Sequence, residues 1–80
     1  MHVRVYITPK KGILDPQGVA IERSLPALGF DGVSGVRVGK FIELELDETD
    51  KTKAKARLDE MCRKLLANTV IENYSIELVG

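Results

Sequence analysis

The sequence has one cysteine, Cys62, one histidine, His2, and no tryptophan among its 80 residues. A single cysteine excludes an internal disulfide, and so few ligands give no framework for a structural zinc site. No apolar run approaches the roughly 20 residues that cross a bilayer. The first residues enter an alternating pattern directly and lack the apolar core of a signal peptide. We therefore expect a cytoplasmic protein.

The charges of the chain balance, with 12 basic and 12 acidic residues. No net field would therefore draw the whole chain to nucleic acid or to an anionic membrane. The length suits a single domain, residues 1–80, that buries only about 60–65% of the surface its unfolded form exposes. With disulfides excluded and no metal cluster, self-association is the remaining way to gain stability. The composition therefore predicts a homo-oligomer, a dimer or a tetramer.

Three segments alternate between apolar and polar side chains, which is the period of a β-strand. The longest covers residues 35–47, and shorter ones cover residues 3–8 and 74–78. In the longest segment the apolar residues all have even numbers, and they are Val36, Val38, Ile42, Leu44 and Leu46. We therefore expect its even residues to face the core and its odd residues to form the opposite, polar face.

Two helices are predicted between these strands. Asp15 is a favourable N-cap, and Pro16 suits the first helical position, where its missing N–H is not needed. A second helix should begin at Thr49 or Asp50 and end near Asn68. Each helix has an apolar stripe that we expect to be buried. The stripes are Val19, Ile21, Leu25 and Leu28 in the first helix, and Ala54, Leu58, Met61, Cys62 and Leu65 in the second.

The order of elements is thus strand, helix, long strand or hairpin, helix, strand. This order predicts an α+β fold, a two-layer sandwich in which a mostly antiparallel sheet carries both helices on one face. Pro26 lies inside the first helical pattern, where it removes a hydrogen bond and clashes with the preceding turn. We expect a kink or a tight final turn there.

Gly39 divides the long alternating segment and leaves two arrangements open. A two-residue turn would put Val36 beside Glu43 and so conflicts with the pattern. A three-residue loop from Gly39 to Phe41 keeps the apolar residues together. A continuous strand that bends or bulges at Gly39 keeps them together as well, but places Lys40 on the apolar face.

No residues in the sequence form a recognisable catalytic set. Gly35 and Gly39-Lys40 resemble part of a phosphate-binding loop, but their spacing is one residue short and Phe41 stands where Ser or Thr is required. Cys62 lies within an apolar helical stripe and has no neighbouring base, so we interpret it as a buried structural residue. No catalytic, cofactor-binding or metal-binding residue is assigned.

Two surfaces are candidates for binding. Basic residues gather at the start of the second helix, at Lys51, Lys53, Lys55 and Arg57, as a solvated face, a docking site or an RNA-binding patch. On the sheet, aromatic and charged residues are expected on the polar face, where association would cover them. The candidate subunit interface consists of Tyr6, Arg37, Lys40, Phe41, Glu43 and Glu45.

Three segments together resemble one known family over nearly the whole chain. They are residues 14–18 (LDPQG), 36–44 (VRVGKFIEL) and 61–74 (MCRKLLANTVIENY). In this order and spacing they are similar to the PurS family, the small subunit of phosphoribosylformylglycinamidine (FGAM) synthase. Pro26 departs from the ordinary helix former expected at that point.

The resemblance implies a non-catalytic role in a three-component ligase of purine biosynthesis. A large synthetase subunit would use ATP and Mg²⁺ to activate the amide of formylglycinamide ribonucleotide, and a glutaminase subunit would supply ammonia. The small subunit would bridge these two partners and help the ammonia to pass, binding no cofactor itself. As an isolated chain its enzymatic status is uncertain. The alternative function is a small RNA-binding module that uses the basic start of the second helix.

Overall fold

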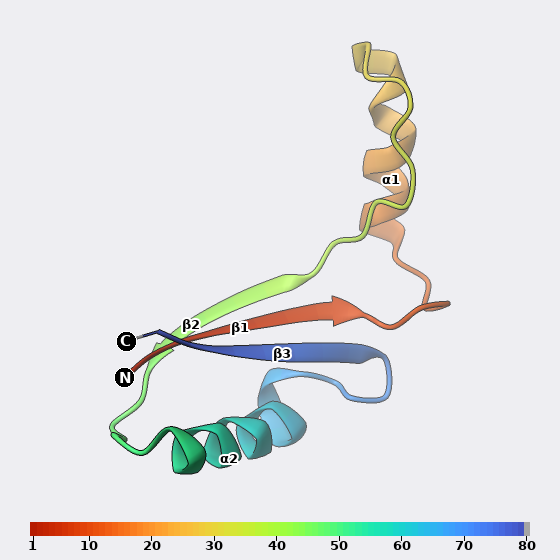
Figure 1. Cartoon of the computed structure of the whole chain (residues 1–80). Coiled ribbons are helices and arrows are strands. Elements are labelled where there is room, and N and C mark those ends of the chain that lie inside the picture. Colours follow the sequence, from red (N-terminus) through yellow and green to blue (C-terminus); the bar gives the residue numbers. More distant parts are fainter. Residues whose placement is uncertain (80) are drawn as a thin grey trace.

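A three-stranded antiparallel sheet forms the centre of the molecule, in a computed structural model that describes residues 1–79. The strand order is β2-β1-β3, with β1 (His2–Pro9) between β2 (Lys40–Glu45) and β3 (Glu72–Val79) (Figure 1). Val5 is paired with Ile42 on one side and with Ile76 on the other. The predicted α+β class and antiparallel sheet are therefore confirmed.

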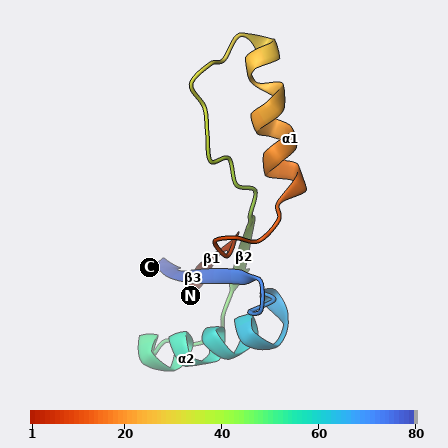
Figure 2. The same ribbon diagram turned by 90° about the vertical axis from the view of Figure 1, so that its right-hand side faces the viewer.

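One face of the sheet is apolar and is covered by α2 (Lys51–Met61) (Figure 2). Val3, Val5 and Ile7 of the central strand are buried there, because their side chains share one side of the pleat. The neighbouring strands add Ile42, Leu44, Ile76 and Leu78 to the same face, and α2 and the turn after it add Ala54, Leu58 and Cys62. The expected division of β2 into even core residues and odd polar residues is confirmed.

Local interactions determine where α2 begins and where it ends. At its start the carboxylate of Asp50 accepts hydrogen bonds from the backbone N–H groups of Thr52 and Lys53, at 2.9 and 3.2 Å. At its end the helix widens into a π-turn, η2 (Cys62–Leu66), in which the N–H of Ala67 donates to the carbonyl of Cys62. The wider turn changes the angular position of the last residues, and Leu65 is 83% exposed. The prediction that Leu65 belongs to the buried stripe was wrong for this reason.

The first helix leaves the sheet instead of covering it. α1 (Pro16–Ser24) and a 3₁₀ turn, η1 (Pro26–Leu28), project beyond the end of the sheet, and residues 29–39 return alongside them (Figure 1). We call residues 15–39 the arm. The expectation that both helices lie on one face is wrong for α1, whose apolar stripe has no sheet beneath it. Val19, Ile21 and Leu28 are accordingly exposed.

The arm is held together mainly by polar contacts to its own backbone. One carboxylate oxygen of Asp15 accepts from the N–H of Gly18 at 3.1 Å, and the other accepts from the N–H of Val38 at 2.8 Å. The carboxylate of Glu22 accepts from the N–H of Val36 at 3.0 Å. These bonds join the helix to the returning segment without a core between them.

Pro26 ends the regular helix, as predicted. α1 stops at Ser24, and the chain makes the tight turn η1 from Pro26. Gly29 then takes a left-handed conformation, with φ of 92°, that closes the helix end. The missing N–H of Pro26 falls in the first turn of η1, where a backbone N–H has no partner within the helix in any case.

Gly39 is the point where the chain enters the sheet, and neither arrangement expected around it is fully correct. There is no hairpin, and β2 begins only at Lys40, so residues 35–39 are not part of a strand. A β-carbon on Gly39 would lie 2.2 Å from the carbonyl oxygen of Ile7, so the close approach to β1 requires glycine. The chain does not fold back on itself at Gly39, in agreement with the continuous arrangement. The strand itself is shorter than predicted.

The overall shape is extended, with dimensions of 49 × 27 × 14 Å. The radius of gyration is 16.0 Å, whereas a compact domain of this length would have about 12 Å. The projecting arm accounts for this difference (Figure 2). No helix within residues 1–79 has both the length and the hydrophobicity needed to cross a lipid bilayer.

Candidate subunit interface

The face of the sheet opposite α2 carries an aromatic pair between two strands. Tyr6 of β1 and Phe41 of β2 are direct partners in the register, and their ring centroids lie 5.3 Å apart. The Tyr6 residue is 40% exposed and Phe41 is 53% exposed. Tilted rings at this distance attract each other through their quadrupoles. Two large apolar rings are therefore fixed on an open surface.

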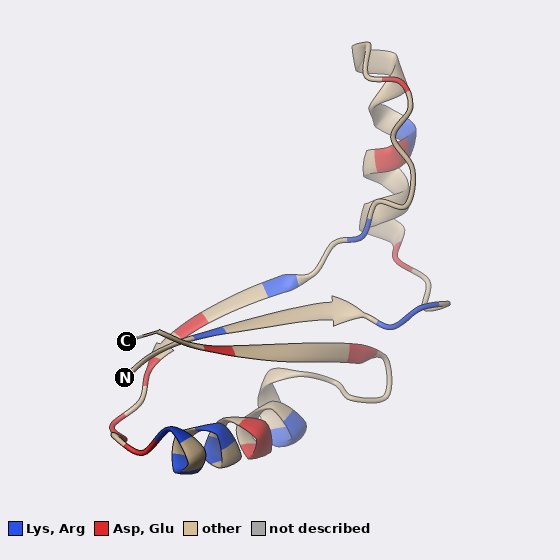
Figure 3. Cartoon of the chain, in the orientation of Figure 1, with Lys and Arg blue, Asp and Glu red and all other residues tan. Residues whose placement is uncertain are grey.

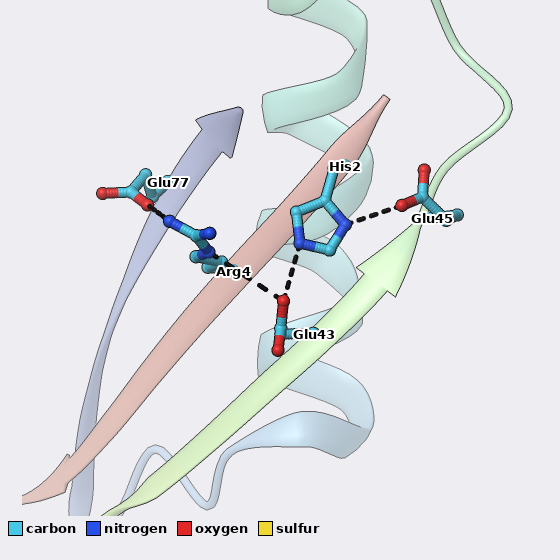
Figure 4. Close-up of polar contacts among 5 residues, drawn as sticks. All are labelled: His2, Arg4, Glu43, Glu45 and Glu77. Atoms are coloured by element: carbon cyan, nitrogen blue, oxygen red, sulfur yellow. Dashed lines mark hydrogen bonds and ion pairs between the residues drawn. The ribbon is translucent and has the colours of Figure 1, made fainter. Parts of the chain in front are cut away.

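Beside the aromatic pair, charged residues of all three strands form a connected network (Figure 4). The Nδ1 atom of His2 lies 2.6 Å from a carboxylate oxygen of Glu45, and its Nε2 atom lies 2.7 Å from one of Glu43. Arg4 continues the network, with Nε 3.9 Å from Glu43 and Nη1 3.1 Å from Glu77. Three carboxylates meet only two basic side chains, so this part of the face has an acidic bias.

The two carboxylates beside His2 favour its protonated form. Hydrogen bonding to Glu45, and then to Glu43, raises the pKa of His2 above its ordinary value of 6.5. His2 therefore stays protonated to a higher pH than an isolated imidazole does. Sequence reasoning gave His2 no partner, because the strand register that sets it opposite Glu45 is not a local signal.

The structure brings together four of the six predicted interface residues, namely Tyr6, Phe41, Glu43 and Glu45. Lys40 is on the other face, because it is the register partner of buried Ile7, and its Nζ lies 3.7 Å from Glu72. Arg37 lies in the arm, where its guanidinium donates to the carbonyl oxygens of Pro9 and Lys10 at 2.8 and 2.9 Å. Lys40 therefore does not share a face with the other candidates, and Arg37 fastens the base of the arm.

A second open surface is the apolar side of the arm, whose helical residues the sequence placed in the core. Its exposed members are Val19, Ile21, Leu28, Phe30 and Val33. The helical period did indicate its residues Val19, Ile21 and Leu28, but a stripe that packs in a core and one that packs on another subunit have the same period. The short length of the chain was the only signal for the second possibility.

No catalytic arrangement is found among residues 1–79. Cys62 is buried, and burial raises the pKa of its thiol, which disfavours the reactive thiolate. Its neighbour Asp59 accepts a hydrogen bond from the hydroxyl of Tyr74, and this contact raises the pKa of Tyr74. His2 is on the opposite side of the sheet and cannot serve Cys62 as a base. Within the same residues no group of potential ligands could hold a metal ion.

The fold and these surfaces define a class of protein, a small α+β domain with an antiparallel sheet, a projecting arm, and apolar and charged surfaces open to solvent. The family model described as "PurS: Phosphoribosylformylglycinamidine (FGAM) synthase" matches residues 2–80. This chain belongs to the PurS family, the small subunit of FGAM synthase. The resemblance found in the three sequence segments is thereby confirmed.

Individual relatives agree with this assignment. The FGAM synthase subunit PurS of Synechocystis sp. is 53% identical over 79 residues, which are 99% of this chain and 79% of the relative. The solved structure of Bacillus subtilis PurS superposes with a TM-score of 0.84 at 43% identity, and covers 95% of this chain and 94% of its own. A chain from the structure of PurLQS from Thermotoga maritima gives 0.81 at 32% identity and 96% coverage of both.

Proposed function

We propose that this chain is the non-catalytic small subunit of an FGAM synthase complex in the cytoplasm. The observation that carries the proposal is the family match across residues 2–80, and the absence of a catalytic arrangement within residues 1–79 supports it. The complex would convert formylglycinamide ribonucleotide to FGAM with glutamine and ATP. We assign ATP and Mg²⁺ to the synthetase subunit, because this chain offers no phosphate-binding loop.

The role of this chain would be to bridge the glutaminase and synthetase subunits and so help ammonia to pass between them. A solved PurLQS assembly contains a chain with this fold, which supports a place for the small subunit among larger partners. The two open surfaces, the polar face of the sheet and the apolar stripe of the arm, provide separate areas for self-association and for partner binding.

Co-purification tests the proposal directly. A tagged form of the full chain should retain its cognate synthetase and glutaminase subunits together, most strongly in the presence of glutamine and ADP. A matched preparation with an unrelated tagged protein of similar size serves as the control. Retention of neither subunit under any of these conditions would contradict the proposal.

The RNA-binding alternative gains no support from the relatives or from the geometry. Single-stranded RNA recognition on a small sheet combines basic residues with exposed aromatic rings on one surface. Here Tyr6 and Phe41 lie on the polar face of the sheet, whereas Lys51, Lys53 and Lys55 belong to α2 on the other side (Figure 3). The two features that RNA would need are separated by the sheet.

A further inference from the structure

The arm, residues 15–39, is ordered although it has no core. Gly18 is the only buried residue within this range, and glycine has no side chain to pack. The large apolar side chains of the arm are open to solvent, among them Leu28, which is 70% exposed, and Phe30, which is 58% exposed. Burial of apolar surface is the dominant favourable term in folding. Within one copy of the chain, the arm lacks that term.

The remaining interactions within the arm are few. The Asp15 carboxylate holds the N–H groups of Gly18 and Val38, and the Glu22 carboxylate holds that of Val36. α1 has nine residues, and isolated helices shorter than about 12–15 residues are marginal in water. Every ordered residue costs conformational entropy, whereas a hydrogen bond that replaces one to water adds little net stability. These bonds can therefore select the conformation of the arm but are too few to hold all of it in place.

The chain also exposes more surface than a compact protein of its mass. Its accessible surface is 5821 Å², whereas a compact monomer of 8.9 kDa exposes about 4,800 Å². The surplus of about 1,000 Å² is close to the area of about 800 Å² that each partner buries in a stable protein–protein interface. One contact of ordinary size would therefore supply the burial that the arm lacks.

A second copy of this chain is suited to that contact. The charges of the arm are nearly balanced, with three acidic residues and two basic ones. The carboxylates of Asp15 and Glu22 and the guanidinium of Arg37 are already bonded to backbone groups. Two arms that meet across a two-fold axis would bring apolar side chains together with little repulsion between like charges. Such a contact is complete with two copies and does not propagate.

We propose that the arm takes its ordered conformation only when a second copy covers its apolar side, so that folding of the arm and self-association are one step. The sheet and α2 do not need this contact, because Val3, Val5 and Leu58 already belong to a buried core. A single copy in solution therefore keeps the sheet and α2, while its arm opens. This inference goes beyond the proposed function and requires neither of the larger subunits.

Hydrogen exchange of the full isolated chain tests the proposal. Two amides report on the arm, that of Val19, which donates to the carbonyl of Asp15, and that of Val38, which donates to the Asp15 carboxylate. Both should be protected in the wild-type oligomer. In Ile21→Asp, which sedimentation velocity should show to be monomeric, both should exchange within about tenfold of the rate of an unstructured peptide. The amides of β1 and α2 should stay at least about a hundredfold slower than that rate.

Ala20→Asp is the matched control for the helix itself. It places the same charge on an exposed residue of α1 outside the apolar side, and it replaces the residue type with the highest helix propensity. This variant should remain oligomeric and keep both reporter amides protected. If its arm loses protection as completely as that of Ile21→Asp, the arm responds to local helix propensity and the proposal is wrong.

The other outcomes are equally decisive. A monomeric Ile21→Asp whose arm stays protected would overturn the proposal, and so would an Ile21→Asp that remains oligomeric, because the apolar side would then not be covered by a second copy. A wild-type arm that exchanges freely in the isolated chain would overturn it too. Protection gained only on adding the cognate synthetase or glutaminase would identify a larger subunit as the partner. None of these results depends on the glutamine-dependent reaction, which tests the proposed function separately.

Discussion

At the scale of single residues, the polar face of the sheet is organised by cross-strand partners. His2 faces Glu45 in the register, and Arg4 faces Glu43 on one side and Glu77 on the other. Opposite charges at directly paired positions attract each other, and the network also reaches diagonally from His2 to Glu43. All these side chains are at least partly exposed, so their main effect is on the charge of the surface and on how it changes with pH.

His2 gives this face a measurable pH dependence. Because its folded-state pKa is raised above 6.5, its ion pairs contribute stability that is fully present below pH 6.5 and is lost as pH rises through the folded-state pKa. The variant His2→Gln should therefore lower the urea midpoint more at about pH 6 than at about pH 8.5, where less of the wild-type imidazole is protonated. The difference should shrink in high salt. An equal effect at both pH values would contradict the account.

At the scale of elements, α1 and α2 are stabilised in two different ways. α2 has its apolar side on the sheet, with Ala54 and Leu58 buried. α1 has no such support and depends on capping and on bonds from Asp15 and Glu22 to the returning segment. We therefore expect the two helices to respond differently to substitution.

In α2, two leucines seven residues apart should behave in opposite ways. Leu58→Ala removes a buried side chain and leaves a cavity, which should cost about 2–5 kcal/mol of stability. Leu65→Ala changes an exposed side chain and should stay within about 0.5 kcal/mol of the wild type. Urea denaturation at one fixed protein concentration measures both. A large loss in Leu65→Ala would show that the π-turn does not turn this leucine outward.

In the arm, Asp15 holds two backbone amides from different segments. Asp15→Ala should speed hydrogen exchange at the N–H groups of Gly18 and Val38, whose acceptor is removed, while the amides of β1 stay protected. Asp31→Ala, in the exposed loop at the tip of the arm, is the matched control and should leave both amides unchanged. Unaltered exchange at Val38 in Asp15→Ala would contradict the role given to the Asp15 carboxylate in joining the two segments of the arm.

At the scale of the whole molecule, the extended shape is the strongest physical argument for association. A small sheet with one helix on it buries Val3, Val5 and Ile7 but leaves the arm without a core of its own. Exposed apolar area of this kind is typical of a surface that another subunit covers. We therefore expect the isolated protein to be a dimer or a tetramer in which the arm is covered.

Sedimentation velocity at micromolar concentration tests this expectation. The wild type should have the mass of a dimer or a tetramer, and Ile21→Asp, which places a charge on the apolar stripe of the arm, should shift the population towards monomer. Lys11→Asp introduces an aspartate in the turn after β1, with an even larger change in charge, and should keep the wild-type mass. A strictly monomeric wild type would contradict the role given to the arm.

The parts of the fold that depend on local sequence could be predicted. The alternation in β1 and β2, the capping carboxylates Asp15 and Asp50, and the tight turn at Pro26 are all local signals, and each predicted the observed structure. Residues 35–39 alternate in the same way but form no strand. They run alongside α1, beyond the Ile7–Lys40 pair at the end of the β1–β2 ladder, and a strand requires a partner.

The candidate site was only partly predictable because it depends on the tertiary arrangement. The alternation of side chains along each strand placed Tyr6 and Phe41 on the polar face. The same alternation could have excluded Lys40 from that face. The outward turn of Leu65 could not be foreseen, because a π-turn has no reliable sequence signal. The exposure of the arm could not be foreseen either, since an apolar stripe does not show whether its own sheet or another subunit covers it.

Reconstitution of the ligase tests the central claim most directly. The cognate synthetase and glutaminase subunits are combined with glutamine, ATP, Mg²⁺ and formylglycinamide ribonucleotide, and the glutamine-dependent formation of FGAM is measured with and without this chain. We predict little product until the chain is added and full activity at a stoichiometric amount. Full glutamine-dependent activity in its absence would contradict the account.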